Sequence, residues 1–221
     1  MTDILTSWSF EAWQATTGIY EKIITHPFVT GMIDGTLPRD RFIFYIEQDS
    51  LYLQRYFKVL AHIASRVDNA SHAAAFMNFA TDGIAVEEAL HESLLAQGAR
   101  SNVEKSPTCT LYTSTLLAQC LEPVEVEAAA VLPCFWIYQR VGEYIFSKAK
   151  NLETNPYREW IQTYADERFA RSTQFAISLC NEMAAKTTPA IRHRMTDIYT
   201  LCSRLEWMFW DSAWNLEHWK I

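Results

Sequence analysis

The stretch Glu125–Lys150, EVEAAAVLPCFWIYQRVGEYIFSKAK, contains the features that decide the fold class. Its length and apolar character predict one long helix. Pro133 lies inside this helix, where it removes a backbone hydrogen bond and crowds the preceding turn at a cost of about 3 kcal/mol. Cys134 follows directly, among bulky aromatic side chains. Taken alone, the stretch is typical of a kinked core helix that carries an inert thiol.

The rest of the chain repeats this pattern of long apolar segments separated by short turn signals. Asn155-Pro156 and Thr188-Pro189 are start signals for helices, Ser71 is suited to cap another, and Gly98 is suited to end it. No segment between turn signals alternates apolar and polar side chains over four or more residues, as a strand does. We therefore expect an all-α protein in which residues 1–221 form one domain. The expected helices are Ser7–Thr25, Phe42–Val67, Ser71–Gly98, Thr108–Leu121, Glu125–Lys150, Pro156–Lys186 with an interruption left open, and Pro189–Leu216, and a short segment spans Phe28–Ile33.

Composition and charge argue against several classes of protein. The formal net charge is −7, whereas binding to nucleic acid usually needs a basic face. The N-terminus lacks the basic and apolar regions of a signal peptide, and no apolar stretch has the length of a membrane span. The five cysteines are scattered and form no CxxC pair, which argues against a disulfide framework or a zinc site. We expect a cytoplasmic protein with reduced thiols.

Polar side chains within apolar helical faces are the candidates for a functional site, because helical bundles build their sites from side chains on facing helices. Asp49 and Tyr52 are three residues apart and therefore share a face. If Asp49 points inward among aromatic neighbours, its carboxylate is poorly solvated and needs a partner. The spacing alone is equally compatible with an exposed aspartate.

A thiol and a second carboxylate lie in other aromatic segments. Cys134 and Tyr138 are four residues apart and share a face, and Tyr164 continues another apolar face. An inward Glu206 would have its pKa raised by loss of solvent, as in a general acid, although an exposed glutamate beside Arg204 is the simpler interpretation. A cysteine nucleophile with a proton-donating glutamate would form a covalent catalyst, and an aromatic pocket suits a flat heteroaromatic substrate.

Glu88 and His91 have the Glu-x-x-His spacing with which di-iron bundles bind metal. Such a site needs a second Glu-x-x-His and two further glutamates, and the sequence contains no second copy. A surface or structural role is therefore favoured for this pair. A metal-dependent oxidase on the same kind of bundle stays open as an alternative.

The order and spacing of these motifs resemble the TenA family, also called thiaminase II or aminopyrimidine aminohydrolase. The resemblance covers nearly the whole chain, and its most specific part is Leu132-Pro133-Cys134 with Trp136, Tyr138 and Val141-Gly142-Glu143. The other matching motifs are His26-Pro27-Phe28, Asp34-Gly35-Thr36-Leu37-Pro38, Gln48-Asp49-Ser50, Glu88-Ala89-Leu90-His91, Ser106-Pro107-Thr108, Tyr112-Thr113, Trp160-Ile161, Thr163-Tyr164 and Glu206 with Phe209-Trp210. One departure is Leu51, where many members of the family have a tyrosine.

This resemblance implies a heme-oxygenase-like helical bundle that assembles as a homotetramer. It implies conversion of 4-amino-5-aminomethyl-2-methylpyrimidine to the hydroxymethyl pyrimidine with release of ammonia, as a step of thiamin salvage. It also implies cleavage of thiamin into its pyrimidine and thiazole parts. The partner is then a small aminopyrimidine or thiamin, and no metal or organic cofactor is expected.

Carried over by position, the resemblance makes Cys134 the nucleophile that adds to the pyrimidine ring. Glu206 would manage protons on the ring nitrogen and the leaving group, and Asp49 would anchor the ring's amino group and nitrogen. The side chains expected to line the substrate pocket are Tyr52, Tyr112, Tyr138, Tyr164 and Phe209. Cys134 assigns the chain to the branch of the family that has this cysteine. A non-catalytic protein that binds pyrimidines or thiamin stays open as a second alternative.

Overall fold

The structure, a computed structural model, describes residues 7–95 and 103–221, with the backbone alone described for residues 86–95. Every regular element in these ranges is helical, which confirms the predicted all-α class. The α-helices are α1 (Trp8–Ile24), α2 (Pro27–Asp34), α3 (Arg39–Arg66), α4 (Ala70–Leu95), α5 (Pro107–Ala118), α6 (Val124–Lys148), α7 (Arg158–Tyr164), α8 (Glu167–Lys186) and α9 (Pro189–Trp214). Two short 3₁₀ helices, η2 (Gln119–Leu121) and η3 (Leu152–Thr154), precede α6 and α7. Within the described ranges, none of these helices is long and apolar enough to cross a membrane.

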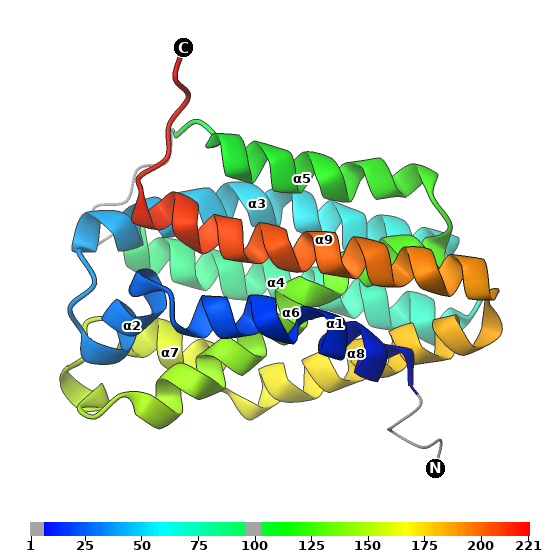
Figure 1. The fold of residues 1–221 in the computed structure, drawn as a ribbon, viewed down its shortest axis with the longest axis horizontal. Coiled ribbons are helices and arrows are strands. Elements are labelled where there is room, and N and C mark those ends of the chain that lie inside the picture. The colour runs from blue at the N-terminus through cyan, green and yellow to red at the C-terminus, as the bar shows by residue number, and fades with distance from the viewer. Residues whose placement is uncertain (1–6, 96–102) are drawn as a thin grey trace.

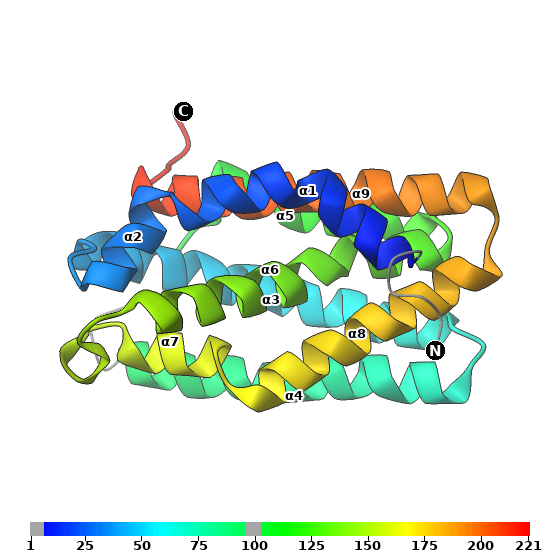
Figure 2. The same cartoon turned by 60° about the horizontal axis from the view of Figure 1, so that its bottom comes forward.

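The helices pack in three layers (Figures 1 and 2). In Figure 2, α1, α9 and α5 lie on one side, α3 and α6 lie in the middle, and α4, α7 and α8 lie on the other side. The packing contacts agree, because α6 contacts both α9 and α8, and α3 contacts both α5 and α4. The two middle helices therefore meet helices of both outer layers, and side chains on them can face each other inside the bundle.

Helix α6 is buried on all sides over much of its length, which explains why its sequence is apolar all round. Ala128, Ala129 and Val141 have no exposed surface. The helix continues through Pro133 rather than ending there, so the proline removes one intrahelical hydrogen bond without breaking the element. Tyr56 of α3 donates from its hydroxyl to the carbonyl oxygen of Val131 at 2.9 Å, which ties α3 to this turn.

The start of α4 differs from the sequence-based prediction. Asn69, rather than Ser71, is the capping residue, because its side-chain oxygen accepts hydrogen bonds from the backbone N–H groups of Ser71 at 2.9 Å and His72 at 3.2 Å. Helix α4 therefore begins at Ala70. The predicted end of this helix at Gly98 lies outside the described residues.

Two other helix starts also depart from expectation. Helix α5 begins at Pro107 because the Ser106 hydroxyl accepts from the backbone N–H of Cys109 at 3.1 Å. Asn155 accepts from the N–H of Tyr157 and forms a turn, and α7 begins only at Arg158.

Several predicted helices end earlier than expected: α5 ends at Ala118 rather than Leu121, α6 at Lys148 rather than Lys150, and α9 at Trp214 rather than Leu216. The interruption left open within Pro156–Lys186 is present between α7 and α8, and the Thr188 cap predicted for α9 is confirmed. The short segment Phe28–Ile33 is part of the helix α2.

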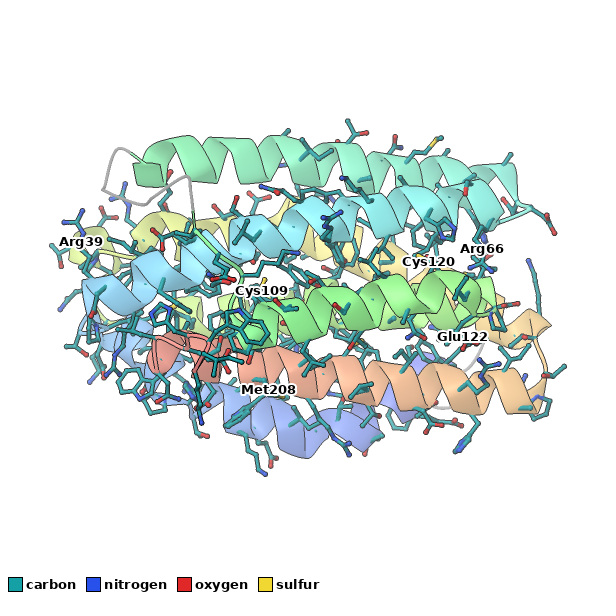
Figure 3. All side chains as sticks on the ribbon, turned by 90° about the horizontal axis from the view of Figure 1, so that it is seen from above. Arg39, Arg66, Cys109, Cys120, Glu122 and Met208 are labelled. Atoms are coloured by element: carbon teal, nitrogen blue, oxygen red, sulfur yellow. The ribbon has the colours of Figure 1, made fainter. Side chains whose placement is uncertain are left out.

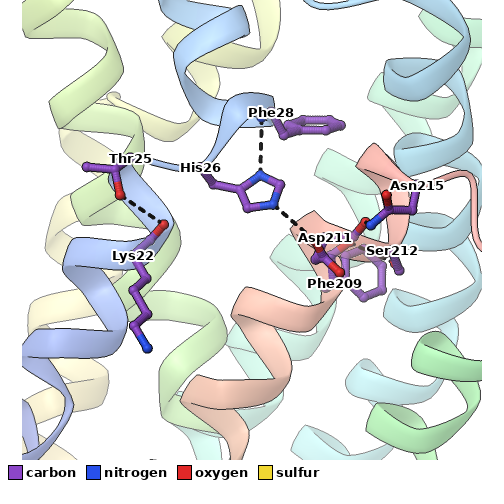
Figure 4. Close-up of polar contacts among 8 residues, drawn as sticks. All are labelled: Lys22, Thr25, His26, Phe28, Phe209, Asp211, Ser212 and Asn215. Carbon is purple, nitrogen blue, oxygen red and sulfur yellow. Dashed lines mark hydrogen bonds and ion pairs between the residues drawn. The ribbon is translucent and has the colours of Figure 1, made fainter.

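His26 joins α2 to α9 (Figure 4). Its Nδ1 accepts from the backbone N–H of Phe28 at 3.1 Å, so the proton of the neutral ring is on Nε2, which lies 3.4 Å from Oδ1 of Asp211. Burial lowers the pKa of His26, although the hydrogen bond with Asp211 opposes this. The ring is therefore neutral at pH 7 and can act as an acceptor at the start of α2.

Candidate active site

Four polar side chains lie along one face of α3. Tyr45, Asp49, Tyr52 and Tyr56 are spaced by four, three and four residues, which returns each to the same side of the helix. All four are buried, and Asp49 is only 7% exposed. This burial decides the alternative that the spacing left open, because the Asp49 carboxylate does not lie on the solvent-exposed face.

A glutamate of α9 meets a tyrosine of α5 inside the bundle. The hydroxyl of Tyr112 donates to Oε1 of Glu206 at 2.6 Å, and both residues are 1% exposed. Burial is the main cause that raises the pKa of Glu206 to about 8, the hydrogen bond from Tyr112 opposes it, and the negative charge of Asp49 adds to it. Glu206 is therefore largely protonated at pH 7 and can act as an acid. The simpler interpretation, an exposed Glu206 beside Arg204, is wrong.

The thiol of Cys134 is surrounded by these groups and is itself buried. As a whole residue Cys134 is half-buried, whereas Cys109, Cys180 and Cys202 are buried. Burial, followed by the negative charges of Glu206 and Asp49, raises the pKa of Cys134 well above its ordinary value. The residue is consequently a neutral thiol at rest, and it needs a nearby positive charge or a proton acceptor to become a nucleophile.

Two hydroxyls of α3 lie close enough to the Cys134 sulfur to stabilise a thiolate. Hydrogen bonds from Tyr52 and Tyr56 oppose the rise in the pKa of the thiol. The Tyr56 hydroxyl also donates to Val131, whereas the buried Tyr52 hydroxyl makes no hydrogen bond of good geometry to a nitrogen or oxygen among the described residues. Tyr52 is therefore the hydroxyl in this group that is available to a bound molecule.

Aromatic rings form a continuous wall beside the thiol and the carboxylates. Tyr45 stacks on Trp210 with ring centroids 5.0 Å apart and an interplanar angle of 9°, and its hydroxyl donates to that of Tyr138 at 3.2 Å. Tyr138 lies 5.1 Å from Tyr164, and Phe209 lies 6.0 Å from Tyr45, between ring centroids. These flat apolar surfaces suit a planar heteroaromatic ligand.

A close approach of α6 and α7 fixes the position of Tyr164. A Cβ atom added at Gly142 would lie 2.6 Å from the backbone carbonyl carbon and oxygen of Tyr164. Only glycine allows the end of α7 to rest this closely on α6. Burial of its hydroxyl raises the pKa of Tyr164 well above its ordinary value, and electrostatic interactions with Asp49, Cys134 and Glu206 add to the rise.

The structure brings the eight predicted site residues into one region, from α3, α5, α6, α7 and α9. These are Asp49, Tyr52, Tyr112, Cys134, Tyr138, Tyr164, Glu206 and Phe209. Sequence reasoning did not single out Tyr45 and Tyr56 as members of this region. The signal for both was the spacing of four and three residues that continues from Asp49 and Tyr52 along α3.

The metal alternative concerns side chains outside the described ones. Glu88 and His91 are on α4, where only the backbone is described, so the structure gives no geometry for the Glu-x-x-His pair. None of the residues with described side chains around Cys134 belongs to a cluster that could hold a metal ion.

Fold and site together define a class of protein, a heme-oxygenase-like helical bundle with an internal thiol, a protonated buried glutamate and an aromatic wall. A domain from Shewanella denitrificans OS217 that is described as having a heme oxygenase-like fold superposes with a TM-score of 0.70. The two are 14% identical, and the match covers 94% of this chain and 92% of that one. A likeness at this identity shows the fold alone.

The chain belongs to the TENA/THI-4/PQQC family, whose model matches residues 13–216. A TenA homologue from Pyrococcus horikoshii OT3 has a TM-score of 0.84 at 27% identity and covers 95% of this chain and 99% of its own.

Two curated relatives carry names that bear on activity. The aminopyrimidine aminohydrolase of Bacillus subtilis is 33% identical over 211 residues, which is 91% of this chain and 87% of the relative. The thiamine biosynthesis multifunctional protein ThiED of Corynebacterium efficiens is 35% identical over 210 residues, or 92% of this chain. The matched part is only 28% of ThiED's own length.

Proposed function

We propose that this protein is an aminopyrimidine aminohydrolase of the thiaminase II type that acts in thiamin salvage. It converts 4-amino-5-aminomethyl-2-methylpyrimidine and water to the hydroxymethyl pyrimidine and ammonia, and it also cleaves thiamin into pyrimidine and thiazole. The observation that carries the proposal is the protonated Glu206, hydrogen-bonded to Tyr112, close enough to the thiol of Cys134 to raise its pKa. The name of the Bacillus subtilis relative supports the same reaction class.

Substrate binding uses the aromatic wall and the buried carboxylate of α3. The pyrimidine ring packs against the rings of Tyr138, Tyr164 and Phe209, which shield it from water. Asp49 accepts hydrogen bonds from the amino group and a protonated ring nitrogen, a pattern that a pyrimidine without the amino group cannot satisfy. The Tyr52 hydroxyl supplies a further polar contact, because bound substrate would complete its hydrogen bonding.

Proton transfer from Glu206 starts the chemistry. The neutral aromatic ring is a poor acceptor for a nucleophile, but a protonated ring nitrogen makes the ring electron-poor and cationic. That positive charge also lowers the pKa of the nearby Cys134 thiol, so the sulfur gives its proton to the Glu206 carboxylate as it adds to a ring carbon. Tyr52 stabilises the sulfur while it carries charge, because its hydroxyl can donate to it.

The leaving group departs once the ring is no longer aromatic. Electron density from the sulfur adduct forms a double bond to the exocyclic carbon, and the amine leaves as ammonia after it takes up a proton from Glu206. Water then adds to the exocyclic carbon and gives its proton to the Glu206 carboxylate. The carbon–sulfur bond breaks, the ring regains aromaticity, and the sulfur takes up the proton that leaves the ring nitrogen, which returns Cys134 to a thiol. The net change is one water consumed and one ammonia released.

A product assay on three substrates tests the proposal. The purified protein is incubated separately with the aminomethyl pyrimidine, its formyl form and thiamin, and the hydroxymethyl pyrimidine is quantified. We expect turnover of the aminomethyl form, and we expect Cys134→Ser to lower it on the order of 10³-fold or more while the variant folds normally. Wild-type turnover by Cys134→Ser would refute the nucleophile. Tight binding with no product from any of the three would instead favour the non-catalytic binder.

We also propose that residues 1–221 act as one helical domain in a cytoplasmic homotetramer. Apolar side chains that lie exposed on α5, among them Leu111 at 48% and Leu117 at 41%, support association through part of the surface. Free, unpaired cysteines are typical of a reducing compartment. Sedimentation velocity tests the assembly, and a monomer at micromolar concentration would contradict it.

A further inference from the structure

We propose that His62, Cys120 and Glu127 form a binding site for one divalent cation of the zinc type, separate from the thiol site. One side chain comes from α3, one from the 3₁₀ helix η2 and one from the first turn of α6. Their ligand atoms, an imidazole nitrogen, a sulfur and a carboxylate oxygen, all lie within 4.8 Å of one another. Figure 3 shows Cys120 with Arg66 and Glu122 at one end of the bundle, opposite the end that carries Arg39.

The three ligand types match one class of cation. Imidazole nitrogen, thiolate sulfur and carboxylate oxygen are the groups that bind Zn²⁺, and three protein ligands leave a fourth position for water. Harder cations such as Mg²⁺ and Ca²⁺ prefer sites made of oxygen atoms alone. The mixed set of His62, Cys120 and Glu127 therefore favours zinc or a chemically similar transition metal.

Protons now occupy the places that the cation would take. His62 Nδ1 lies 2.7 Å from Oε1 of Glu127, and the Cys120 thiol hydrogen-bonds to the same carboxylate. Both contacts bring a ligand atom to the Glu127 carboxylate. A cation bound there would replace the two shared protons with little movement of the helices. The half-exposed ring of His62 gives the cation a path from solvent, whereas Glu127 is fully buried.

Arg66 orients the carboxylate rather than blocking it. Its Nη1 donates to Oε2 of Glu127 at 2.6 Å, which leaves Oε1 directed at His62. Its Nη2 donates to the backbone oxygen of Glu122 at 2.6 Å and so fixes the residues that follow η2. A hydrogen-bonded partner of this kind, one shell beyond the ligands, holds ligating carboxylates in place in metal sites. With thiolate, carboxylate and guanidinium present, a bound divalent ion leaves a net charge of only +1.

The absence of a CxxC pair argues only against zinc sites that contain two cysteines close together in sequence. This cluster has one cysteine, and its histidine lies far along the chain from Cys120 and Glu127; the packing of α3 against α6 and η2 brings the three together. The cluster does not overlap the Glu88–His91 pair that motivated the oxidase alternative. The proposed site therefore implies no role for metal in the thiol chemistry.

A cobalt titration of the full chain tests the site. Protein treated with a chelator is titrated with Co²⁺, whose thiolate-to-metal charge-transfer absorption reports a Cys–Co bond, and Zn²⁺ is then added to displace it. We expect one equivalent of Co²⁺ to bind with this absorption. Cys120→Ser should abolish the absorption, and both Cys120→Ser and His62→Gln should weaken binding at least about ten-fold. Cys134→Ser serves as the control, because Cys134 is the other cysteine that is not fully buried as a residue. This variant should keep both the charge-transfer absorption and the wild-type affinity for Co²⁺.

Cys120→Ser also separates metal binding from ordinary structure. The contacts of Glu127 with His62 and Arg66 do not involve Cys120, and a serine hydroxyl can replace the hydrogen bond from the thiol to Glu127, so the variant should unfold at the wild-type temperature without metal. Zn²⁺ should raise the unfolding temperature of the wild type but not of Cys120→Ser. No saturable Co²⁺ binding, or charge-transfer absorption that survives Cys120→Ser and disappears in Cys134→Ser, would overturn the proposal.

Discussion

Replacement of Glu206 by glutamine tests whether burial sets the protonation state of the proposed acid. The pKa of Glu206 is raised from 4.5 to about 8 on folding. At a pH between these two pKa values, Glu206 keeps its proton in the folded protein but has released it in the unfolded chain. The free energy of unfolding therefore falls by about 1.4 kcal/mol for each pH unit that the pH rises. At pH 7, where Glu206 in the folded protein is about nine-tenths protonated, the total loss in the free energy of unfolding is about 3 kcal/mol.

Glutamine has nearly the same shape and can still accept the hydrogen bond from Tyr112, but it does not titrate. The assay is urea unfolding of wild type and Glu206→Gln at pH 5, 6, 7 and 8, at one fixed protein concentration. The variant should gain stability relative to the wild type by about 1.4 kcal/mol per pH unit, and the difference should level off above pH 8. Glu11→Gln, at an exposed position, controls for the loss of one formal charge. Parallel curves for wild type and Glu206→Gln from pH 5 to 8 would refute the raised pKa.

Two further predictions concern the supports of the site. Gly142→Ala should destabilise the protein by about 1–3 kcal/mol and reduce turnover, because the new methyl group meets the Tyr164 backbone. Gly18→Ala is the control: its methyl group would meet nothing within 4 Å, so neither stability nor turnover should fall. Melting temperature and product rate for the two variants check this, and equal behaviour would contradict it. Because His26 has a lowered pKa, the unfolded chain binds a proton first as the pH falls below 6.5. The wild type should then lose stability relative to His26→Gln between pH 7 and 5, as measured by urea midpoints. A constant difference in stability between the two proteins would mean that the His26 ring, which accepts from the Phe28 N–H, does not titrate in this range.

Much of the helical architecture could be predicted from the sequence because its boundaries depend on local chemistry. The Thr188-Pro189 start depends on one side chain and on the fixed backbone angle of proline, both visible in a short window. The choice between Asn69 and Ser71 was not visible, because both can cap a helix and only the observed turn decides which oxygen faces the free N–H groups.

The site was less predictable than the helices because spacing shows which residues share a face but not which faces meet. Asp49 and Glu206 each had an exposed alternative until the packing of α3 and α9 placed both inside. The family resemblance, rather than spacing, indicated that the eight predicted residues face a common site. It did not supply Tyr56, whose hydroxyl contacts α6 at Val131, or the cluster around Glu127, which depends on how three elements cross.

The stacked pair of Tyr45 and Trp210 constrains how this protein can evolve. Both rings have no exposed surface, so the wall of the site is also part of the hydrophobic core. A substitution that reshapes this wall for a different ligand also removes core packing, at about 3–5 kcal/mol for a large aromatic cut to alanine. Changes in substrate preference are therefore easiest at half-buried positions of the wall such as Tyr164, which packs against the core without being one of its buried residues. Related chains should diverge first at these positions and keep the stacked pair.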